Sequence, residues 1–108
     1  MLRMTIKKLT MQTIGTHNYY VYILTNKNKT VLYIGVTNNI KNRIAYHKTS
    51  KSAFTYKYNC FYLIYYERFG DVNQAIKREK ILKGWKRFKK ENLINEFNVE
   101  WRFLNDDV

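Results

Sequence analysis

The sequence predicts an α/β (α+β) domain, a small antiparallel three-stranded sheet flanked by helices in the order β-β-α-β-α-α. Three observations support this prediction. Two short aromatic and β-branched runs stand on either side of a polar stretch, a third run is apolar on both faces, and the remaining segments carry helical periodicity. With 108 residues, the chain is expected to form one domain around a single core.

The strands are expected at residues 19–24, 31–34 and 60–69. The segment between the first two is rich in Asn and Lys, which suits a hairpin loop slightly longer than the tightest turns. The third run, CFYLIYYERF, lacks alternation and is expected to be buried on both faces. Residues 48–59 are polar and mixed, and we expect a loop there, anchored by Phe54 and Tyr58.

The first helix is expected after Gly35, with Thr37 or Asn38 as its N-cap. At 100° per residue, the apolar positions 40 and 44 share one stripe with Arg43 and His47. An arginine and a histidine are therefore expected beside the apolar seam of this helix.

A second helix is expected to begin with a capping box at Asp71 and Gln74 and to end or bend at Gly84. Glu79 falls within its apolar stripe, which consists of Val72, Ala75, Ile76 and Leu82. A carboxylate in such a place must be paired, protonated or bound to a cation. Two alternatives follow: an ion pair with an arginine such as Arg43, or a ligand for a hard divalent cation.

A last helix is expected over residues 87–97, and a C-terminal tail is expected to pack on the core. The apolar seam of this helix consists of Leu93, Ile94 and Phe97, and the tail residues that we expect to contact the core are Trp101, Phe103 and Leu104.

The formal net charge is +12, and basic residues cluster in KREKILKGWKRFKK at residues 77–90. Such a field is typical of a nucleic-acid partner; an anionic membrane surface and an inert basic protein are the alternatives. The residues predicted to contact nucleic acid are Lys77, Arg78, Lys83, Lys86, Arg87, Lys89 and Lys90.

Several functional classes are disfavoured by the composition. The single cysteine, Cys60, cannot form an intramolecular disulfide or supply a cysteine zinc site. No apolar stretch approaches the roughly 20 residues that a membrane span needs, so no membrane partner is expected. Residues 1–18 lack the apolar core of a secretory signal and are expected to form a disordered extension to a domain at 19–108. We expect a cytoplasmic location.

Five short motifs in order carry a resemblance to a known family. The hairpin holds VYI at 21–23 and YIG at 33–35, and the runs LIYYE, AIKRE and NVEW follow. Together they resemble the GIY-YIG nuclease superfamily, and in particular its short stand-alone bacterial members, which are similar to the N-terminal nuclease domain of the bacterial repair excinuclease. The resemblance covers about residues 19 to 104.

The resemblance implies roles for the hairpin and the first helix. Tyr22 would activate water, as a phenolate or through a hydrogen-bond relay with His47. Tyr33 would orient the water or the scissile phosphate, and Arg43 would stabilise the charge on phosphorus. Gly35 would close its strand without a side chain, so that the next helix and a phosphate can come close.

The resemblance also implies one bound divalent cation, Mg²⁺ or Mn²⁺, held by Glu79. Family members often use an asparagine after this glutamate. Asn92, Asn95 and Asn98 all compete for that role here, with Asn98 as the provisional choice.

The function expected from charge and resemblance together is a metal-dependent DNA endonuclease, in repair or in the processing of branched DNA. Two alternatives stay open: a nucleic-acid-binding module on the same fold with little cleavage activity, and a basic RNA- or ribosome-associated factor. The sequence does not distinguish DNA from RNA.

Overall fold

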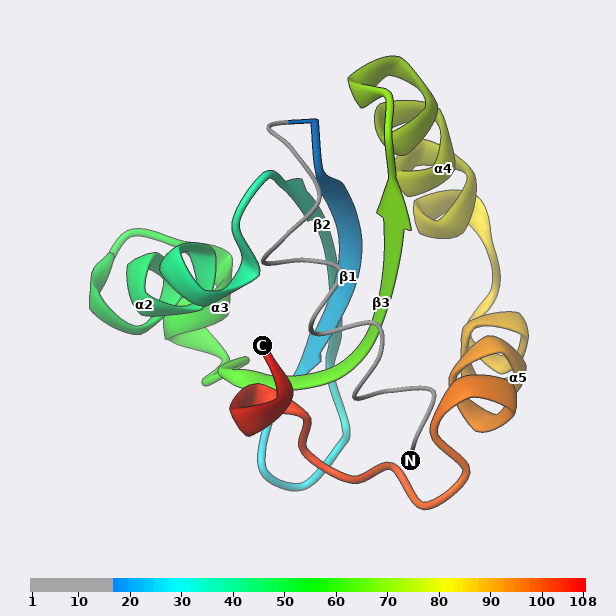
Figure 1. Cartoon of the computed structure of the whole chain (residues 1–108). Coiled ribbons are helices and arrows are strands. Elements are labelled where there is room, and N and C mark those ends of the chain that lie inside the picture. The colour runs from blue at the N-terminus through cyan, green and yellow to red at the C-terminus, as the bar shows by residue number, and fades with distance from the viewer. Residues whose placement is uncertain (1–16) are drawn as a thin grey trace.

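A computed structural model describes residues 17–108, so most of the predicted extension at 1–18 lies outside the described residues. Figure 1 shows the predicted sheet of three antiparallel strands with helices on either side. The elements in chain order are β1 (Tyr19–Thr25), β2 (Leu32–Thr37), α2 (Ile40–Thr49), α3 (Phe54–Lys57), β3 (Tyr62–Phe69), α4 (Val72–Gly84), α5 (Arg87–Phe97) and the 3₁₀ turn η1 (Asn105–Asp107).

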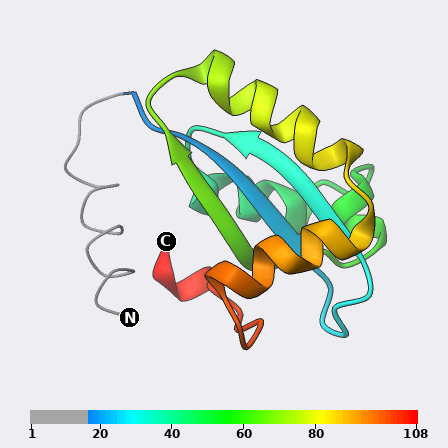
Figure 2. The ribbon, with the colours of Figure 1, turned by 90° about the vertical axis from the view of Figure 1, so that its right-hand side faces the viewer.

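Strand β1 lies at the centre of the sheet, in the order β2-β1-β3, and is covered on both faces. Alternate side chains of β1 enter two separate cores, because successive residues of a strand point to opposite faces. Tyr20, Tyr22 and Leu24 pack with α2, whereas Val21 and Ile23 pack with α4 and α5. Figure 2 shows α4 and α5 crossing one face of the sheet while α2 and α3 lie behind it.

A β-bulge in β3 adjusts this strand to the two cores. Ile23 pairs with Tyr65 while the next residue of β1, Leu24, pairs with Leu63, so Ile64 is the extra residue. As a result, Ile64 and Tyr65 both belong to the core beneath α4 and α5. The predicted burial of this run is confirmed for residues 63–66.

The first half of the chain departs from the prediction at two boundaries, the end of β2 and the start of α2. Strand β2 continues through Gly35 to Thr37, so the glycine does not end it. The N-cap of α2 is Asn39, whose side chain accepts from the backbone N–H of Asn42 at 3.0 Å, and not Thr37 or Asn38. Thr37 instead accepts from the backbone N–H of Asn39 at 3.1 Å and so shapes the turn before the helix.

The segment expected to be a loop at 48–59 contains the last residues of α2 and the short helix α3. The expectation that Phe54 and Tyr58 anchor it is wrong, because both rings are exposed, Phe54 at 50%. The buried residue of this segment is Thr55, and Cys60, directly after the segment, is buried as well. The anchor is therefore one small polar side chain and one thiol, for which the aromatic pattern gave no indication.

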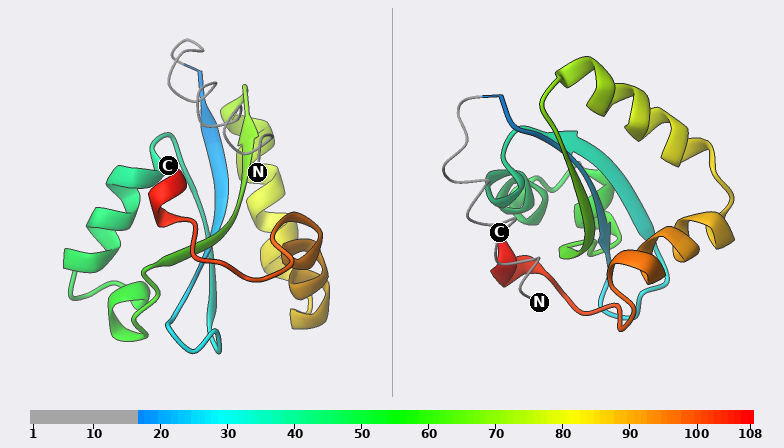
Figure 3. Two further views of the ribbon diagram at one scale, coloured as in Figure 1. Left: turned by 60° about the horizontal axis from the view of Figure 1, so that its bottom comes forward. Right: turned by 45° about the vertical axis from the view of Figure 1, so that its right-hand side comes forward.

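The second half follows the prediction closely. Asp71 caps α4 by accepting from the backbone N–H of Gln74 at 3.0 Å, and α5 spans 87–97 as expected. Val72 is 38% exposed, so its assignment to the buried stripe is wrong; it stands in the first turn, beyond the covered part of the sheet. Figure 3 shows the chain running from α5 past β3 to the C-terminal turn, where the backbone N–H of Leu104 donates to the carbonyl of Leu63 at 2.7 Å.

Gly35 pairs directly with Tyr22 across β1 and β2, and the phenol ring lies over the glycine. A Cβ atom at position 35 would come within 2.4 Å of the Tyr22 hydroxyl oxygen and 2.5 Å of its ring carbon Cζ. The glycine therefore makes room for a side chain of the protein itself, and not for the approach of the next helix.

We expect Gly35→Ala to lower the free energy of unfolding by roughly 1–3 kcal/mol, the usual cost of overpacking a core. Gly84→Ala is the matched control, because no atom lies within 4 Å of the Cβ it would add. The added methyl group suits the end of a helix, so this control should be neutral or slightly stabilising. Denaturant unfolding of both variants measures the difference, and equal stability would contradict the contact between Tyr22 and Gly35.

Candidate active site

A buried hydrogen bond between Tyr22 and His47 forms the centre of the candidate site. The hydroxyl of Tyr22, on β1, lies 2.9 Å from Nε2 of His47, on α2. Tyr22 is only 1% exposed and His47 only 3% exposed. Of the predicted stripe of positions 40, 43, 44 and 47, Arg43 is exposed, whereas Ile40, Ile44 and His47 are buried and bring the imidazole against the central strand.

The second nitrogen of the His47 ring is also engaged. Its Nδ1 lies 2.7 Å from the hydroxyl oxygen of Thr55, which belongs to α3 and is buried. The imidazole is therefore held at both nitrogens, between a phenol and an aliphatic hydroxyl. A ring held in this way has a fixed orientation, as is required of a histidine that transfers a proton.

Burial and nearby charges set the proton affinity of both partners. Burial lowers the pKa of His47, and the positive charge of Arg43 lowers it further, so the imidazole is neutral near pH 7. Burial raises the pKa of Tyr22, as do Tyr33 and the charge of Glu79, while Arg43 opposes these effects. A free phenolate at Tyr22 is thus disfavoured by its surroundings, whereas the relay with His47 has its hydrogen bond in place.

Tyr33 and Arg43 complete the cluster around this pair. The ring of Tyr33 is half-buried, with its centroid 6.3 Å from that of Tyr22 and 5.1 Å from that of His47. Arg43 is exposed at the rim, with its guanidinium 5.3 Å from the ring centroid of Tyr46. The structure therefore brings Tyr22, Tyr33 and His47 together and places Arg43 beside them.

Glu79 lies on α4, which packs against β1 and β2. Its side chain is 14% exposed and forms an ion pair with Lys83, one helical turn later, at 2.8 Å. The pairing with Arg43 that the sequence left open is not formed. Glu79 is linked to the phenol by its charge, which contributes to the raised pKa of Tyr22.

The residues around Glu79 suit a divalent cation that takes few of its ligands from the protein itself. Within residues 17–108, no group of three or more His, Cys, Asp or Glu side chains could enclose a metal ion. Lys83 contacts the Oε2 atom of Glu79 at 2.8 Å, and the carboxylate is the acidic group that this part of α4 offers to a cation. One carboxylate oxygen completed by water and phosphate oxygens is a common Mg²⁺ arrangement, so the donor set suits a cation that binds together with its substrate.

Two of the three candidate asparagines have other hydrogen-bond partners, and the third is exposed. The amide of Asn98 donates to the backbone carbonyls of Ile64 and Arg102 and accepts from the backbone N–H of Arg102. Asn95 accepts from the indole N–H of Trp101, and Asn92 is exposed. In the part of the chain that the structure describes, no hydrogen bond joins any of them to Tyr22 or His47, and Asn98 serves to anchor the tail.

The basic segment at 77–90 divides into two groups. Three of its seven predicted contact residues form ion pairs within the described chain: Arg78 with Glu67, Lys83 with Glu79, and Arg87 with Glu91. Arg87 also donates to the carbonyls of Lys29 and Thr30, and so ties α5 to the hairpin loop. The other four of the seven predicted contact residues, for which no ion pair is seen among residues 17–108, are Lys77, Lys86, Lys89 and Lys90.

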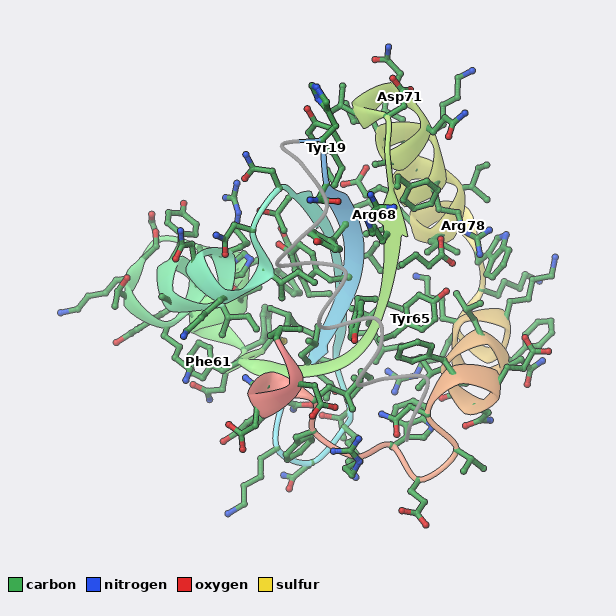
Figure 4. All side chains as sticks on the ribbon, in the orientation of Figure 1. Tyr19, Phe61, Tyr65, Arg68, Asp71 and Arg78 are labelled. Atoms are coloured by element: carbon green, nitrogen blue, oxygen red, sulfur yellow. The ribbon has the colours of Figure 1, made fainter. Side chains whose placement is uncertain are left out.

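Arg78 is held in place by contacts with both an acidic and an aromatic side chain. Its guanidinium makes a two-point contact with Glu67, at 3.0 Å and 2.8 Å, and also lies 5.4 Å from the ring centroid of Trp85. Glu67 in turn accepts a hydrogen bond from the hydroxyl of Tyr65. Figure 4 shows Tyr65 and Arg78 on the α4 side of the sheet. The Arg78 side chain thus joins α4 to β3.

Thr55 is the site residue that sequence reasoning missed. It lies in a segment without periodicity, eight positions after His47, and a short helix brings it back to the imidazole. The sequence offered one indication, a small hydroxyl residue between two aromatic residues. A contact between a residue in an expected loop and a histidine has no characteristic spacing, so this indication was not enough to predict the hydrogen bond.

The described site thus combines a buried phenol–imidazole pair on the antiparallel sheet, an arginine at the rim and a glutamate on the helix of the opposite face. A family model described as the GIY-YIG catalytic domain matches residues 18–92. The chain therefore belongs to the GIY-YIG family, as the motifs predicted. This is a nuclease superfamily, whose members act on nucleic acid and generally use a divalent metal ion.

Sequence relatives agree with this assignment. A UPF0213 protein from Bacillus pumilus is 34% identical over 85 residues, which make up 78% of this chain and 86% of the relative. A UPF0213 protein from Natronomonas pharaonis is 36% identical over 78 residues, 71% of this chain and 91% of the relative. The solution NMR structure of a UPF0213 protein from Bacillus halodurans is 34% identical and covers 72% of this chain and 83% of its own, with a TM-score of 0.48.

Over residues 17–108, none of the helices combines the length and the apolar character that crossing a bilayer requires.

We expect Arg78→Gln to lower the free energy of unfolding by roughly 1–3 kcal/mol, because it leaves a partly buried carboxylate without its charged partner. Lys77→Gln is the matched control on the same helix, since Lys77 is exposed and forms no ion pair with a described residue. Its effect should stay within about 0.5 kcal/mol. Thermal or denaturant unfolding measures both variants. An unchanged stability for Arg78→Gln would contradict the structural role and leave Arg78 among the residues predicted to contact nucleic acid.

Proposed function

We propose that this protein is a metal-dependent endonuclease that hydrolyses phosphodiester bonds of DNA, in repair or in the processing of branched DNA. The observation that carries the proposal is the buried 2.9 Å hydrogen bond between Tyr22 and His47, beside Tyr33 and Arg43. The family to which the chain belongs is one of nucleases, which supports the same proposal.

The charge of the chain supports a nucleic-acid substrate. The net charge is +12, and four of the seven predicted contact residues are left without ion pairs in the described chain: Lys77, Lys86, Lys89 and Lys90. We assign phosphate contacts to these four, and a structural role to Arg78 and Arg87. The buried free thiol of Cys60 is compatible with the reducing cytoplasm that we propose as the location.

The chemistry begins with a proton transfer through the buried pair. A water molecule gives a proton to the Tyr22 oxygen as Tyr22 gives its own proton to Nε2 of the neutral His47. The water oxygen then attacks phosphorus, and the bond from phosphorus to the leaving oxygen breaks.

The other site residues act on the phosphate. Arg43, at the rim, can donate to the phosphate oxygens as negative charge builds up in the transition state. Tyr33 orients the attacking water or the scissile phosphate. Glu79 would hold Mg²⁺ or Mn²⁺, and such an ion, when bound, supplies charge stabilisation at the leaving oxygen.

One observation favours a second candidate, a nucleic-acid-binding module with little cleavage activity. Glu79 is already paired with Lys83, and a cation must compete with that lysine for the carboxylate. DNA is our proposed substrate, but RNA has the same phosphate chemistry. Incubation of the pure protein with branched, nicked, single-stranded and duplex DNA and with RNA, with and without Mg²⁺ or Mn²⁺, separates these functions.

We expect Tyr22→Phe to lower the single-turnover cleavage rate by on the order of 10²–10⁴, the usual contribution of a positioned acid or base. Tyr33→Phe should lower the rate less, because a hydroxyl that only orients the water or the phosphate contributes less than one that transfers the proton. Tyr62→Phe is the control, since that tyrosine stacks on Phe103 at the far end of β3. A near-wild-type rate for Tyr22→Phe would return the phenol to a packing role, and melting temperatures confirm folding in each case.

We expect Glu79→Gln to abolish metal-dependent cleavage while the fold and nucleic-acid binding persist, because the amide keeps the shape but not the charge of a cation ligand. Glu91→Gln removes a carboxylate that is likewise paired one helical turn away, but is exposed and lies on α5. Its cleavage rate should match wild type. Cleavage by both variants at equal rates removes Glu79 from the metal site, and absence of cleavage in the wild-type protein favours the binding module.

A further inference from the structure

Thr55 is buried, and its hydroxyl forms one hydrogen bond among the described residues, to Nδ1 of His47 at 2.7 Å. The residue stands in the first turn of α3, a helix whose aromatic side chains are exposed. Thr55 is thus the residue that α3 contributes to the interior. A methyl-bearing residue of the same volume would fill the space equally well, so the hydroxyl requires a separate explanation.

The hydrogens in this chain of two bonds can be ordered in two ways, because two hydroxyls flank one neutral imidazole. Either Tyr22 donates to Nε2 and the Nδ1–H donates to Thr55, or Thr55 donates to Nδ1 and the Nε2–H donates to Tyr22. A phenol, with a pKa of about 10, is the better donor of the two hydroxyls, and an aliphatic hydroxyl is the better acceptor. The first order is therefore favoured.

We propose that Thr55 is a positioning residue that fixes His47 in the Nδ1–H tautomer, so that Nε2 stays open to accept the proton of Tyr22. Only in this order can the relay run from water to Tyr22 and on to His47, because the opposite order fills Nε2 with a proton. The imidazolium that forms keeps its Nδ1–H on the Thr55 oxygen. This inference rests on the proposed function for its catalytic meaning, whereas the tautomer itself does not depend on it.

The groups around the imidazole agree with a neutral ring of one tautomer. Tyr22, Tyr33 and Tyr46 face it from β1, β2 and α2, and the charge of Arg43 opposes its protonation. None of these contacts involves a carboxylate. Thr55 is thus the acceptor in the described structure for a proton on Nδ1.

The test compares Thr55→Val, Thr55→Ser and the control Thr49→Val. Valine keeps the shape of threonine and removes the acceptor, whereas serine keeps the hydroxyl. Thr49 is an exposed threonine at the end of α2 whose hydroxyl donates to backbone carbonyls of its own helix, so its replacement makes the same chemical change away from the imidazole. Each variant also carries His17→Gln, which leaves His47 as the single histidine of the chain.

Nitrogen-15 NMR of the labelled imidazole is the first readout, and it needs no substrate. We expect wild type, Thr55→Ser and Thr49→Val to show a protonated Nδ1 and an unprotonated Nε2, and Thr55→Val to show the opposite tautomer or a mixture. A protonated Nε2 in the wild-type spectrum, or an unchanged tautomer in Thr55→Val, overturns the proposal. The wild-type spectrum decides the matter even if Thr55→Val does not fold.

Single-turnover cleavage is the second readout. We expect Thr55→Val to lose on the order of 10- to 100-fold in rate, as is typical when the partner that orients an imidazole is removed, with Thr55→Ser restoring most of it. A wild-type rate for Thr55→Val overturns the positioning role. If the wild-type protein cleaves no substrate, the proposed function fails on its own, and the NMR result still decides the tautomer.

Discussion

The hydrogen bond between Tyr22 and His47 is the constraint on which the arrangement of this small domain depends. A phenol oxygen can be buried at the centre of a sheet only if it has a partner, because an unsatisfied polar group in the interior is costly. That partner must come from α2, which fixes the rotation of the helix and buries positions 40 and 44 with the imidazole. The ring must also lie flat across the neighbouring strand, which leaves room for nothing larger than Gly35. The packing of α2, the pairing of Tyr22 with Gly35 and the candidate chemistry therefore all involve the hydroxyl oxygen of Tyr22.

Much of the fold could be predicted from local pattern, and the reasons are visible in particular residues. Asp71 and Gln74 mark the start of α4 because capping is a contact within four residues, and α5 matches its expected span for a similar reason. The ends of β2 and α2 were misplaced, because Thr37, Asn38 and Asn39 are all suitable caps and tertiary packing selects among them. Helix α3 was not predicted because four residues carry too little periodicity.

The candidate site could be predicted in part for the same reason. Tyr22, Tyr33 and His47 are brought together as the motifs and the helical stripe imply. The pair of Glu79 and Lys83 has the i,i+4 spacing of a helix, whereas Glu67 lies on β3, eleven positions before Arg78, and only the tertiary fold brings these two together. A cluster of positive charge in a sequence therefore overstates the free charge of the folded surface, since the same residues also hold helices in place.

The C-terminal tail has a consequence beyond the packing of its apolar residues. Strand β3 stands at one edge of the sheet, where unpaired backbone groups would invite another chain to add a strand. Here the tail occupies that edge: Leu104 and Asn105 satisfy the backbone of Leu63, and Asn98 satisfies the carbonyl of Ile64. Residues 98–105 thus leave fewer backbone groups of β3 open to the addition of a strand from another chain. An asparagine that resembles a catalytic residue in sequence is, in this fold, part of what closes an open edge.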